Sequence, residues 1–117
     1  MRTGTTPEQG DIVLVPVPFT DLSSQKRRPV IVISNDAYNG SALDVVVVAM
    51  TSNPAAVPYS FRITASDLTQ GSLNRPGTVR ADKVFALAQS IIVKRFGKVS
   101  KHVVEHIRQL LHNLVAK

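Results

Sequence analysis

Residues 10–34 read GDIVLVPVPFTDLSSQKRRPVIVIS, and this stretch decides the fold of the chain. Two apolar runs rich in β-branched residues flank a polar loop, a pattern that predicts two short strands joined by a turn. The loop ends in three consecutive cations, and Pro29 opens the second run. Proline fixes its own φ and favours an extended backbone in the residue before it. Arg28 is therefore expected at the mouth of a strand, where a guanidinium can serve a phosphate.

Further apolar runs alternate with turn-forming segments along the chain. We expect strands at residues 12–17, 30–33, 44–50, 59–64, 78–82 and 84–88, and turns or loops at 34–42, 51–54 and 71–77. The run at 44–50, DVVVVAM, is apolar on both sides of the pleat, so it is expected inside the sheet. Short strands with frequent turns and no alternating helices indicate a small barrel of about six strands.

The last segment changes its period. Apolar residues recur at spacings of three and four between positions 103 and 115, which predicts an amphipathic helix, and Ser100 is suited to its N-cap. The expected fold class is therefore mainly β (α+β), a barrel closed by one C-terminal helix. Residues 1–9 are polar and are expected to form a flexible tail, and residues 10–117 a single domain.

Composition limits the function classes. The 117 residues carry a formal charge of +6, which favours acidic or phosphate-rich partners. Cysteine is absent, which excludes a disulfide framework and thiolate chemistry. Aromatic residues make up only 5%, without tryptophan, which argues against binding that depends on base stacking. No window reaches membrane-spanning length and no leader pattern is visible, so we expect a cytoplasmic protein with no membrane association.

A pattern in the C-terminal helix imitates a metal site. His102, Glu105 and His106 fit the H-x-x-E-H spacing of some zinc peptidases. They fall on the polar side of the helix, and no later glutamate follows as a third ligand. We interpret them as a solvated face and expect no metal and no cofactor.

The order of the motifs resembles that of the PemK/MazF/Kid family, the endoribonuclease toxins of bacterial toxin–antitoxin pairs. Four motifs follow one another before the amphipathic helix, so the resemblance covers nearly the whole chain. They are GDIVLVPVPFT, KRRPVIVIS, VVVVAMTS and TVRADKV. The resemblance implies an SH3-like barrel, a homodimer, and metal-independent, sequence-specific cleavage of single-stranded RNA. It also implies a cognate acidic antitoxin as the partner.

The resemblance carries over to particular residues. Arg28 matches the arginine before the family's proline, and Thr51 matches the hydroxyl residue that ends the central strand. Arg80 and Asp82 match an arginine–aspartate pair that some members use in catalysis. These four are the candidate catalytic residues, and the candidate RNA contacts are Gln25, Lys26, Arg27, Ser52 and Asn53. Residues 21–25, DLSSQ, lack the His or Glu that members often place in this loop.

These residue types suit RNA cleavage by attack of the 2′-OH, which leaves a 2′,3′-cyclic phosphate and a 5′-OH. Arginine stabilises charge on the phosphoryl group, threonine positions it by hydrogen bonding, and Asp82 is the more plausible proton acceptor. In isolation, Arg80 and Asp82 could equally form an ordinary surface ion pair. Two alternative functions stay open: a non-enzymatic gyrase poison on a CcdB-like barrel, and a nucleic-acid-binding barrel without activity.

Overall fold

The computed structural model describes residues 6–16, 27–54 and 56–117. The described elements, in chain order, are β1 (Asp11–Pro16), β2 (Arg27–Val32), α1 (Asp36–Ser41), β3 (Asp44–Thr51), β4 (Ser60–Ile63), η1 (Ala65–Asp67), β5 (Leu68–Gly71), β6 (Gly77–Ala88), η2 (Gln89–Ile91), β7 (Lys94–Val99) and α2 (Lys101–Val115).

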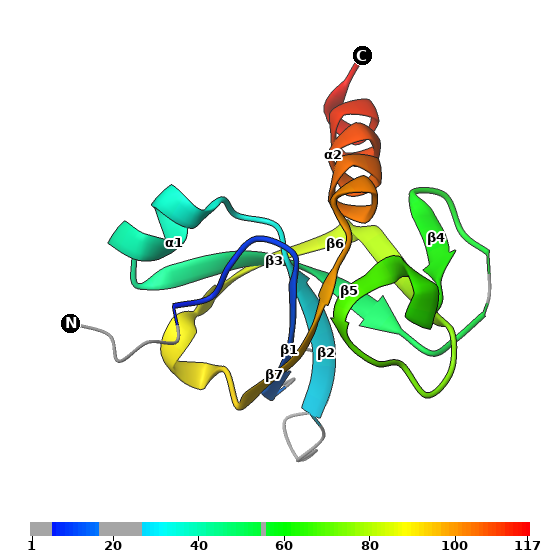
Figure 1. Cartoon of the computed structure of the whole chain (residues 1–117). Helices are drawn as coiled ribbons and strands as arrows, with labels where there is room; N and C mark the ends of the chain where they lie inside the picture. Colours follow the sequence, from blue (N-terminus) through cyan, green and yellow to red (C-terminus); the bar gives the residue numbers. More distant parts are fainter. Residues whose placement is uncertain (1–5, 17–26, 55) are drawn as a thin grey trace.

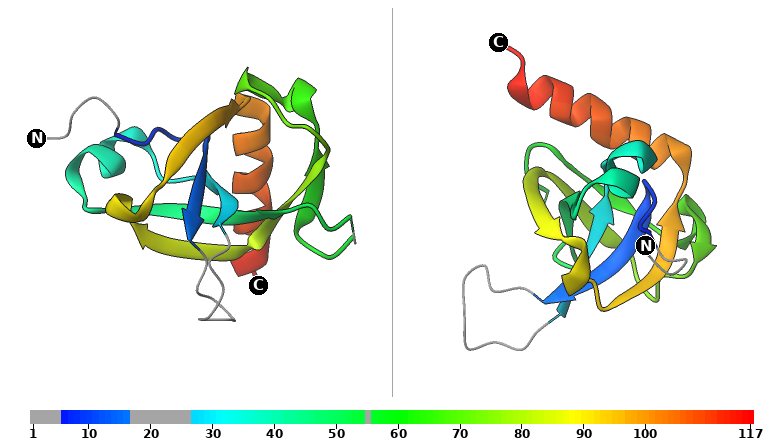
Figure 2. Two further views of the ribbon diagram at one scale, coloured as in Figure 1. Left: turned by 90° about the horizontal axis from the view of Figure 1, so that it is seen from below. Right: turned by 90° about the vertical axis from the view of Figure 1, so that its left-hand side faces the viewer.

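The described strands form one antiparallel sheet of seven in the order β4-β6-β3-β2-β1-β7-β5. Its two edge strands, β4 and β5, are separated in the chain by residues 64–67 alone. So short a connection brings the two edges of the sheet together, and the sheet is therefore curled into a half-barrel (Figures 1 and 2). The expected mainly β fold with a C-terminal helix is confirmed, with seven strands in place of about six.

Two apolar clusters fill the two sides of the sheet. The first contains Ile12, Ile31, Val48 and Met50 together with Val103 and Ile107 of α2. The second contains Val13, Val15, Val30, Val32, Val45 and Val47, and Phe85, Leu87 and Ile92 pack against it. β3 contributes to both clusters, as expected for a strand that is apolar on both sides of the pleat.

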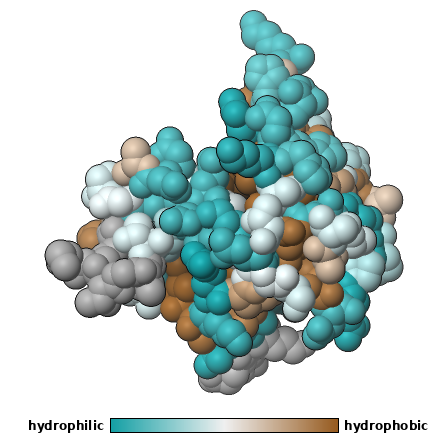
Figure 3. Space-filling model, in the orientation of Figure 1, coloured by the Kyte–Doolittle hydropathy of each residue, from teal (hydrophilic) through white to brown (hydrophobic). Residues whose placement is uncertain are grey.

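The C-terminal helix α2 follows β7 directly and stands out from the body of the sheet (Figures 1 and 2). Its buried residues, Val103 and Ile107, lie in its first half. The projecting half is hydrophilic on the side seen in Figure 3. Ser100 occupies the N-cap position as expected, but its side chain makes no capping bond and its Oγ lies 2.8 Å from Nδ1 of His102.

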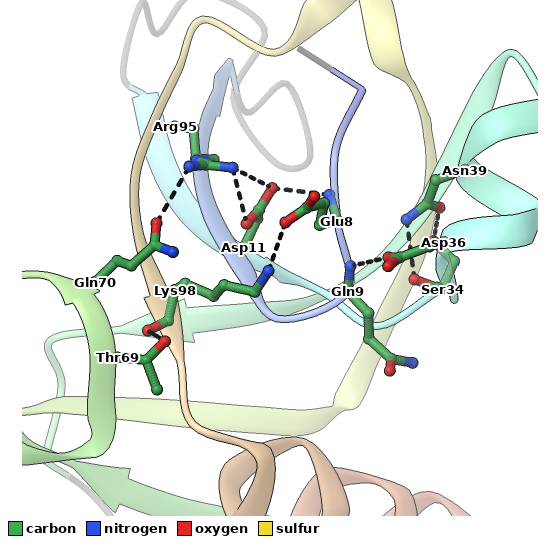
Figure 4. A network of polar contacts seen from close by, with 10 residues as sticks. All are labelled: Glu8, Gln9, Asp11, Ser34, Asp36, Asn39, Thr69, Gln70, Arg95 and Lys98. Carbon is green, nitrogen blue, oxygen red and sulfur yellow. Dashed lines mark hydrogen bonds and ion pairs between the residues drawn. The ribbon is translucent and has the colours of Figure 1, made fainter. Parts of the chain in front are cut away.

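The N-terminal segment is attached to the sheet earlier than the expected boundary at residue 10. The backbone N–H of Glu8 donates to Asp11 at 2.8 Å, and the Glu8 carboxylate pairs with Lys98 at 2.6 Å. The backbone N–H of Gln9 donates to Asp36 at 2.9 Å (Figure 4). Glu8 and Gln9 therefore belong to the folded unit, because each is fixed by contacts to distant parts of the chain.

One predicted turn is wrong. Residues 34–42 contain the helix α1, not a series of turns. Asn35 caps this helix, since its side chain accepts a hydrogen bond from the backbone N–H of Tyr38 at 2.8 Å. In the sequence the Asn39–Gly40 pair resembles a hairpin turn. In the structure the pair lies inside α1, where Asn39 is buried and its side chain is hydrogen-bonded to Ser34.

Three further predictions need correction. The segments at 78–82 and 84–88 are one strand, β6, interrupted by a bulge. Residues 68–71 form β5, so the loop expected at 71–77 starts one residue later, and β7 has no counterpart among the expected strands. Both unexpected strands contain glycine, which weakens a strand pattern, and they pair with one another at the sheet edge.

No helix within the described ranges is long and apolar enough to cross a membrane.

Candidate active site

The strand register aligns polar side chains from four strands. Val30 of β2 pairs with Ala49 of β3. If this antiparallel register is continued by two residues, back along β2 and forward along β3, Arg28 comes opposite Thr51. Thr51 in turn pairs with Thr78 of β6, and Thr78 pairs with Arg62 of β4. We call the four residues Arg28, Thr51, Thr78 and Arg62 the polar row.

Alternation along the strands places these side chains on one face of the sheet. Val30 and Val47 belong to the second apolar cluster, and Arg28 and Thr51 lie an even number of residues from them. Val79 and Ala81 belong to the first cluster, so Thr78, Arg80 and Asp82 face the opposite way, toward the second. Arg28, Thr51, Arg80 and Asp82, the four predicted catalytic residues, therefore share a face.

Arg80 and Asp82 form a bidentate ion pair on this face. Arg80 Nε donates to Oδ1 of Asp82 at 2.9 Å, and Nη2 donates to Oδ2 at 2.8 Å. The hydrogen bonds from Arg80 lower the pKa of Asp82 below its ordinary value, and the same pairing raises the pKa of Arg80. Asp82 is therefore ionised at neutral pH, as a proton acceptor must be, although the lowered pKa also makes it a weaker base.

A bulge in β6 presents this pair. Ala49 of β3 is opposite Arg80 while the preceding residue, Val48, is opposite Val84. Residues 81–83 are therefore extra on the β6 side. The backbone N–H of Ala81 donates to the carbonyl of Tyr59 at 3.0 Å, and Tyr59 has a positive φ of 63°. Strained backbone of this kind is often found where a site holds side chains in a set direction.

Two threonines fix the loop that follows β3. Thr51 Oγ1 accepts a hydrogen bond from the backbone N–H of Asn53 at 3.2 Å, which leaves its hydroxyl proton to be donated. Thr78 is buried, and its Oγ1 donates to the carbonyl of Asn53 at 2.9 Å. The hydroxyls therefore hold residues 51–53 against the start of β6.

The cations differ in their surroundings. Arg28 is exposed at the start of β2, and within the described ranges it has no ion pair, unlike Arg80. Arg27 precedes it directly, so alternation turns its side chain to the other face of the sheet. Alternation therefore places Arg28 on the same face as Thr51, Arg80 and Asp82 and turns Arg27 to the opposite face.

The other predicted contact residues lie around the loop after β3 or outside the described ranges. Ser52 and Asn53 are exposed. Gln25 and Lys26 fall on residues 17–26, which the structure does not describe.

Arg62 and Thr78 join the site without having been predicted for it. Arg62 is exposed, and its Nη1 donates to Oγ1 of Thr78 at 3.0 Å. The alternation of residues 59–64 shows in the sequence that Arg62 is on the polar side of a strand. Its place in the polar row depends on the pairing of β4 with β6, for which the sequence carries no signal.

The histidines of the H-x-x-E-H pattern have other neighbours. His102 Nε2 lies 3.3 Å from Oδ1 of Asp67, and the ring of His106 stacks on Phe61 with centroids 3.9 Å apart. Within the described part of the chain, no group of three or more His, Cys, Asp or Glu residues could hold a metal ion.

Comparisons with known proteins agree with this fold. Residues 8–115 match the model of the family described as PemK-like, MazF-like toxin of type II toxin–antitoxin system. Endoribonuclease MazF6 of Mycobacterium tuberculosis (strain H37Rv) is 32% identical over 93 residues, which cover 77% of this chain and 79% of that protein. Endoribonuclease MazF2 of Mycobacterium bovis has the same identity and coverage.

Solved structures show the same architecture. The MazE–MazF crystal structure (form III) from Deinococcus radiodurans superposes with a TM-score of 0.77 at 26% identity, covering 95% of this chain and 97% of that one. A mycobacterial endoribonuclease in complex with its cognate antitoxin superposes with a TM-score of 0.74 at 22% identity, covering 92% of each chain. The motif order, the half-barrel and the family match over residues 8–115 show that the chain belongs to the PemK-like, MazF-like toxins of type II toxin–antitoxin systems.

Proposed function

We propose that this toxin is an endoribonuclease that cuts single-stranded RNA at a specific sequence, without a metal ion, by attack of a ribose 2′-OH on the adjacent phosphorus. The observation that carries the proposal is the shared face of Arg28, Thr51, Arg80 and Asp82. It combines a guanidinium that has no ion pair among the described residues, a hydroxyl donor and a carboxylate. The relatives named as endoribonucleases support the same activity.

Arg28 is proposed to stabilise the negative charge that develops on the phosphoryl oxygens. Its guanidinium stays protonated at any physiological pH and can bind two oxygens at once. A donor of this type commonly contributes about 3–4 kcal/mol to transition-state stabilisation. Thr51 is proposed to donate its hydroxyl proton to a phosphate oxygen, since its Oγ1 already accepts from Asn53.

Asp82 is proposed to accept the proton of the 2′-OH, with Arg80 holding the carboxylate in place. The ion pair keeps Asp82 ionised at the cost of basicity. Its contribution is therefore expected near the lower end of the ~10²–10⁴-fold range of general base catalysis. Five further residues are proposed to contact parts of the RNA other than the reacting phosphate: Gln25, Lys26, Arg27, Ser52 and Asn53.

The proposed partner is a cognate antitoxin with an acidic segment. A chain of net charge +6 attracts an acidic peptide over a distance, and that peptide would compete with RNA for the same cations. The crystallised relative with its cognate antitoxin supports such a complex. We also propose that the protein forms a homodimer and acts in the cytoplasm.

Fragment analysis tests the activity directly. The purified protein is incubated with single-stranded RNA in the presence of EDTA, and the fragment ends are identified. We expect 2′,3′-cyclic phosphate and 5′-OH ends, and no cleavage of the DNA of the same sequence, which lacks the 2′-OH. Intact RNA together with inhibited gyrase would favour the CcdB-like poison instead, and RNA binding without any cleavage would favour a binding module.

A further inference from the structure

Arg62 of β4 is a cation that the proposed mechanism does not use. It is exposed, and within the described part of the chain it has no acidic partner, whereas Arg80, Arg95 and Arg108 each have one. β4 is an edge strand, and in the described sheet it is hydrogen-bonded to β6 alone. Exposed arginines without a counter-charge, gathered on one face, form a site for anions.

A buried hydroxyl holds the Arg62 side chain. Nη1 donates to Thr78 Oγ1 at 3.0 Å, and Thr78 is only 2% exposed and is itself bonded to the carbonyl of Asn53. The bond uses one of the five N–H donors of the guanidinium. The remaining donors are therefore presented from a fixed position, which lowers the entropic cost of binding an anion.

The spacing in the polar row determines which anion Arg62 can reach. Arg28 and Arg62 are separated by Thr51 and Thr78, which is three strand spacings, or about 14 Å along the sheet. This spacing separates the two backbones, and the Arg62 guanidinium is held at the Thr78 hydroxyl of β6, two strand spacings from Arg28. One continuous chain with a phosphate at each nucleotide satisfies both.

We propose that Arg62 is a further RNA-binding residue, which takes a backbone phosphate other than the one that is cleaved, and that Thr78 positions it. The inference rests on the proposed nuclease function and adds the direction of the substrate, across the sheet from β2 to β4. Arg62 binds ground state and transition state alike, so its loss raises KM and leaves kcat nearly unchanged.

The salt dependence of binding tests this inference. Affinity for a random-sequence, single-stranded 2′-O-methyl RNA, which the protein cannot cut, is measured over a range of salt concentrations. Each phosphate contact on a single strand contributes about 0.7 to the slope of log K against log salt. We expect Arg62→Ala to reduce the slope by about 0.7 and to weaken binding about tenfold.

Two further variants make the result specific. Arg62→Lys keeps the charge, so we expect it to keep the slope, and it serves as the test variant if alanine disturbs the fold. Arg108→Ala is the matched control, because Arg108 is an exposed arginine on α2 that pairs with Glu105. Cleavage of a natural random-sequence RNA, measured in parallel, gives KM and kcat.

Each outcome decides a separate claim. If the unaltered protein cleaves RNA and Arg62→Ala has the same salt slope, affinity and KM as the unaltered protein, the role of Arg62 is overturned. The nuclease function is not affected by that result. RNA binding by the unaltered protein without cleavage overturns the nuclease, while the slope still decides the role of Arg62. If the unaltered protein neither binds nor cuts RNA, both proposals are wrong.

Discussion

The guanidinium of Arg80 binds both carboxylate oxygens of Asp82, two residues further along β6, at 2.9 and 2.8 Å. Side chains two residues apart in an extended strand point to the same side; Arg80 is paired with Ala49 in the ladder, and Asp82 lies in the bulge at residues 81–83. The arginine lowers the pKa of the aspartate. The pair therefore determines the ionisation of the proposed proton acceptor.

Replacing Asp82 by asparagine tests that role. Asp82→Asn keeps the shape but removes the acceptor, and we expect cleavage to slow by about 10²-fold. Because the folded pKa of Asp82 lies below its ordinary value, the rate of the unaltered protein should be flat through neutral pH and should fall only in acid. The measurement is kcat/KM against pH. A rate for Asp82→Asn equal to that of the unaltered protein would remove Asp82 from the mechanism.

The same pair makes a small contribution to stability with a defined pH dependence. Asp82 has a lowered folded pKa, so its contribution is present above the unfolded value and is lost as the pH falls through the folded value. Both side chains are about a quarter exposed, so the loss amounts to about 1 kcal/mol at most. Urea unfolding of Asp82→Asn should lack this acid-dependent loss.

Arg28 and Arg27 are neighbours in the chain with different expected effects. Arg28→Ala should lower kcat by about 10²–10³-fold, since one donor to a developing oxyanion is removed. Arg27→Ala should raise KM and leave kcat unchanged, because alternation along β2 turns Arg27 to the other face. Single-turnover cleavage of RNA measures both. Equal losses of kcat in the two variants would mean that the strand alternation does not define the site.

The hydroxyl of Thr51 is tested with a pair of variants. Thr51→Val keeps the size and branching of the side chain and removes the donor to phosphate, whereas Thr51→Ser keeps the hydroxyl. We expect valine to slow cleavage about tenfold or more and serine to retain most of the rate. Full activity of Thr51→Val would restrict Thr51 to its bond with the backbone N–H of Asn53.

Part of the candidate site is predicted from the sequence and part is not. Arg28 is predicted by a local signal, a proline after a cationic loop, whereas Thr51, Arg80 and Asp82 are predicted from the resemblance to the family. Arg62 and Thr78 enter the polar row only through the pairing of β4 with β6, which joins residues far apart in the chain. Strand pairing is set by long-range packing, so one sequence does not reveal it.

The fold shows the same division. The continuous apolar run of β3 and the periodic apolar face of α2 are strong signals, and they predict bounds close to the observed ones. The helix α1 is only six residues long and contains glycine, so its sequence resembles a turn. It forms a helix in the structure, and Asn35 caps it. β5 and β7 are held by their pairing with one another and by the pairing of β7 with β1, and neither has a clear pattern of its own.

Asp11 has the opposite pH dependence from Asp82. Its carboxylate is fully buried, accepts a hydrogen bond from the Glu8 backbone and lies 3.4 Å from Arg95 (Figure 4). Burial raises its pKa above the ordinary value of 3.8 in spite of these partners. The folded state therefore binds the proton more tightly, and stability from this group falls as the pH rises from 3.8 through the folded pKa.

Urea unfolding of Asp11→Asn isolates this effect, because asparagine does not titrate. The free energy of unfolding of the unaltered protein, minus that of the variant, should decrease as the pH rises over this interval. An increase would show that Arg95 and Lys98 stabilise the charged carboxylate by more than its burial costs.

Two glycines should respond to alanine with opposite signs. Gly71 has a φ of +78°, and a Cβ there would lie 2.2 Å from the carbonyl oxygen of Phe96 on the paired strand β7. Gly71→Ala should therefore destabilise the protein by at least about 2 kcal/mol, through backbone strain and the loss of this close approach. Gly40 lies inside α1, and a Cβ there would meet no atom within 4 Å. Gly40→Ala should stabilise by about 0.5–1 kcal/mol, because alanine has the higher helix propensity. Urea midpoints of the two variants give both values, and a neutral Gly71→Ala would mean that β5 is not held against β7 as closely as the register Gly71↔Gly97 requires.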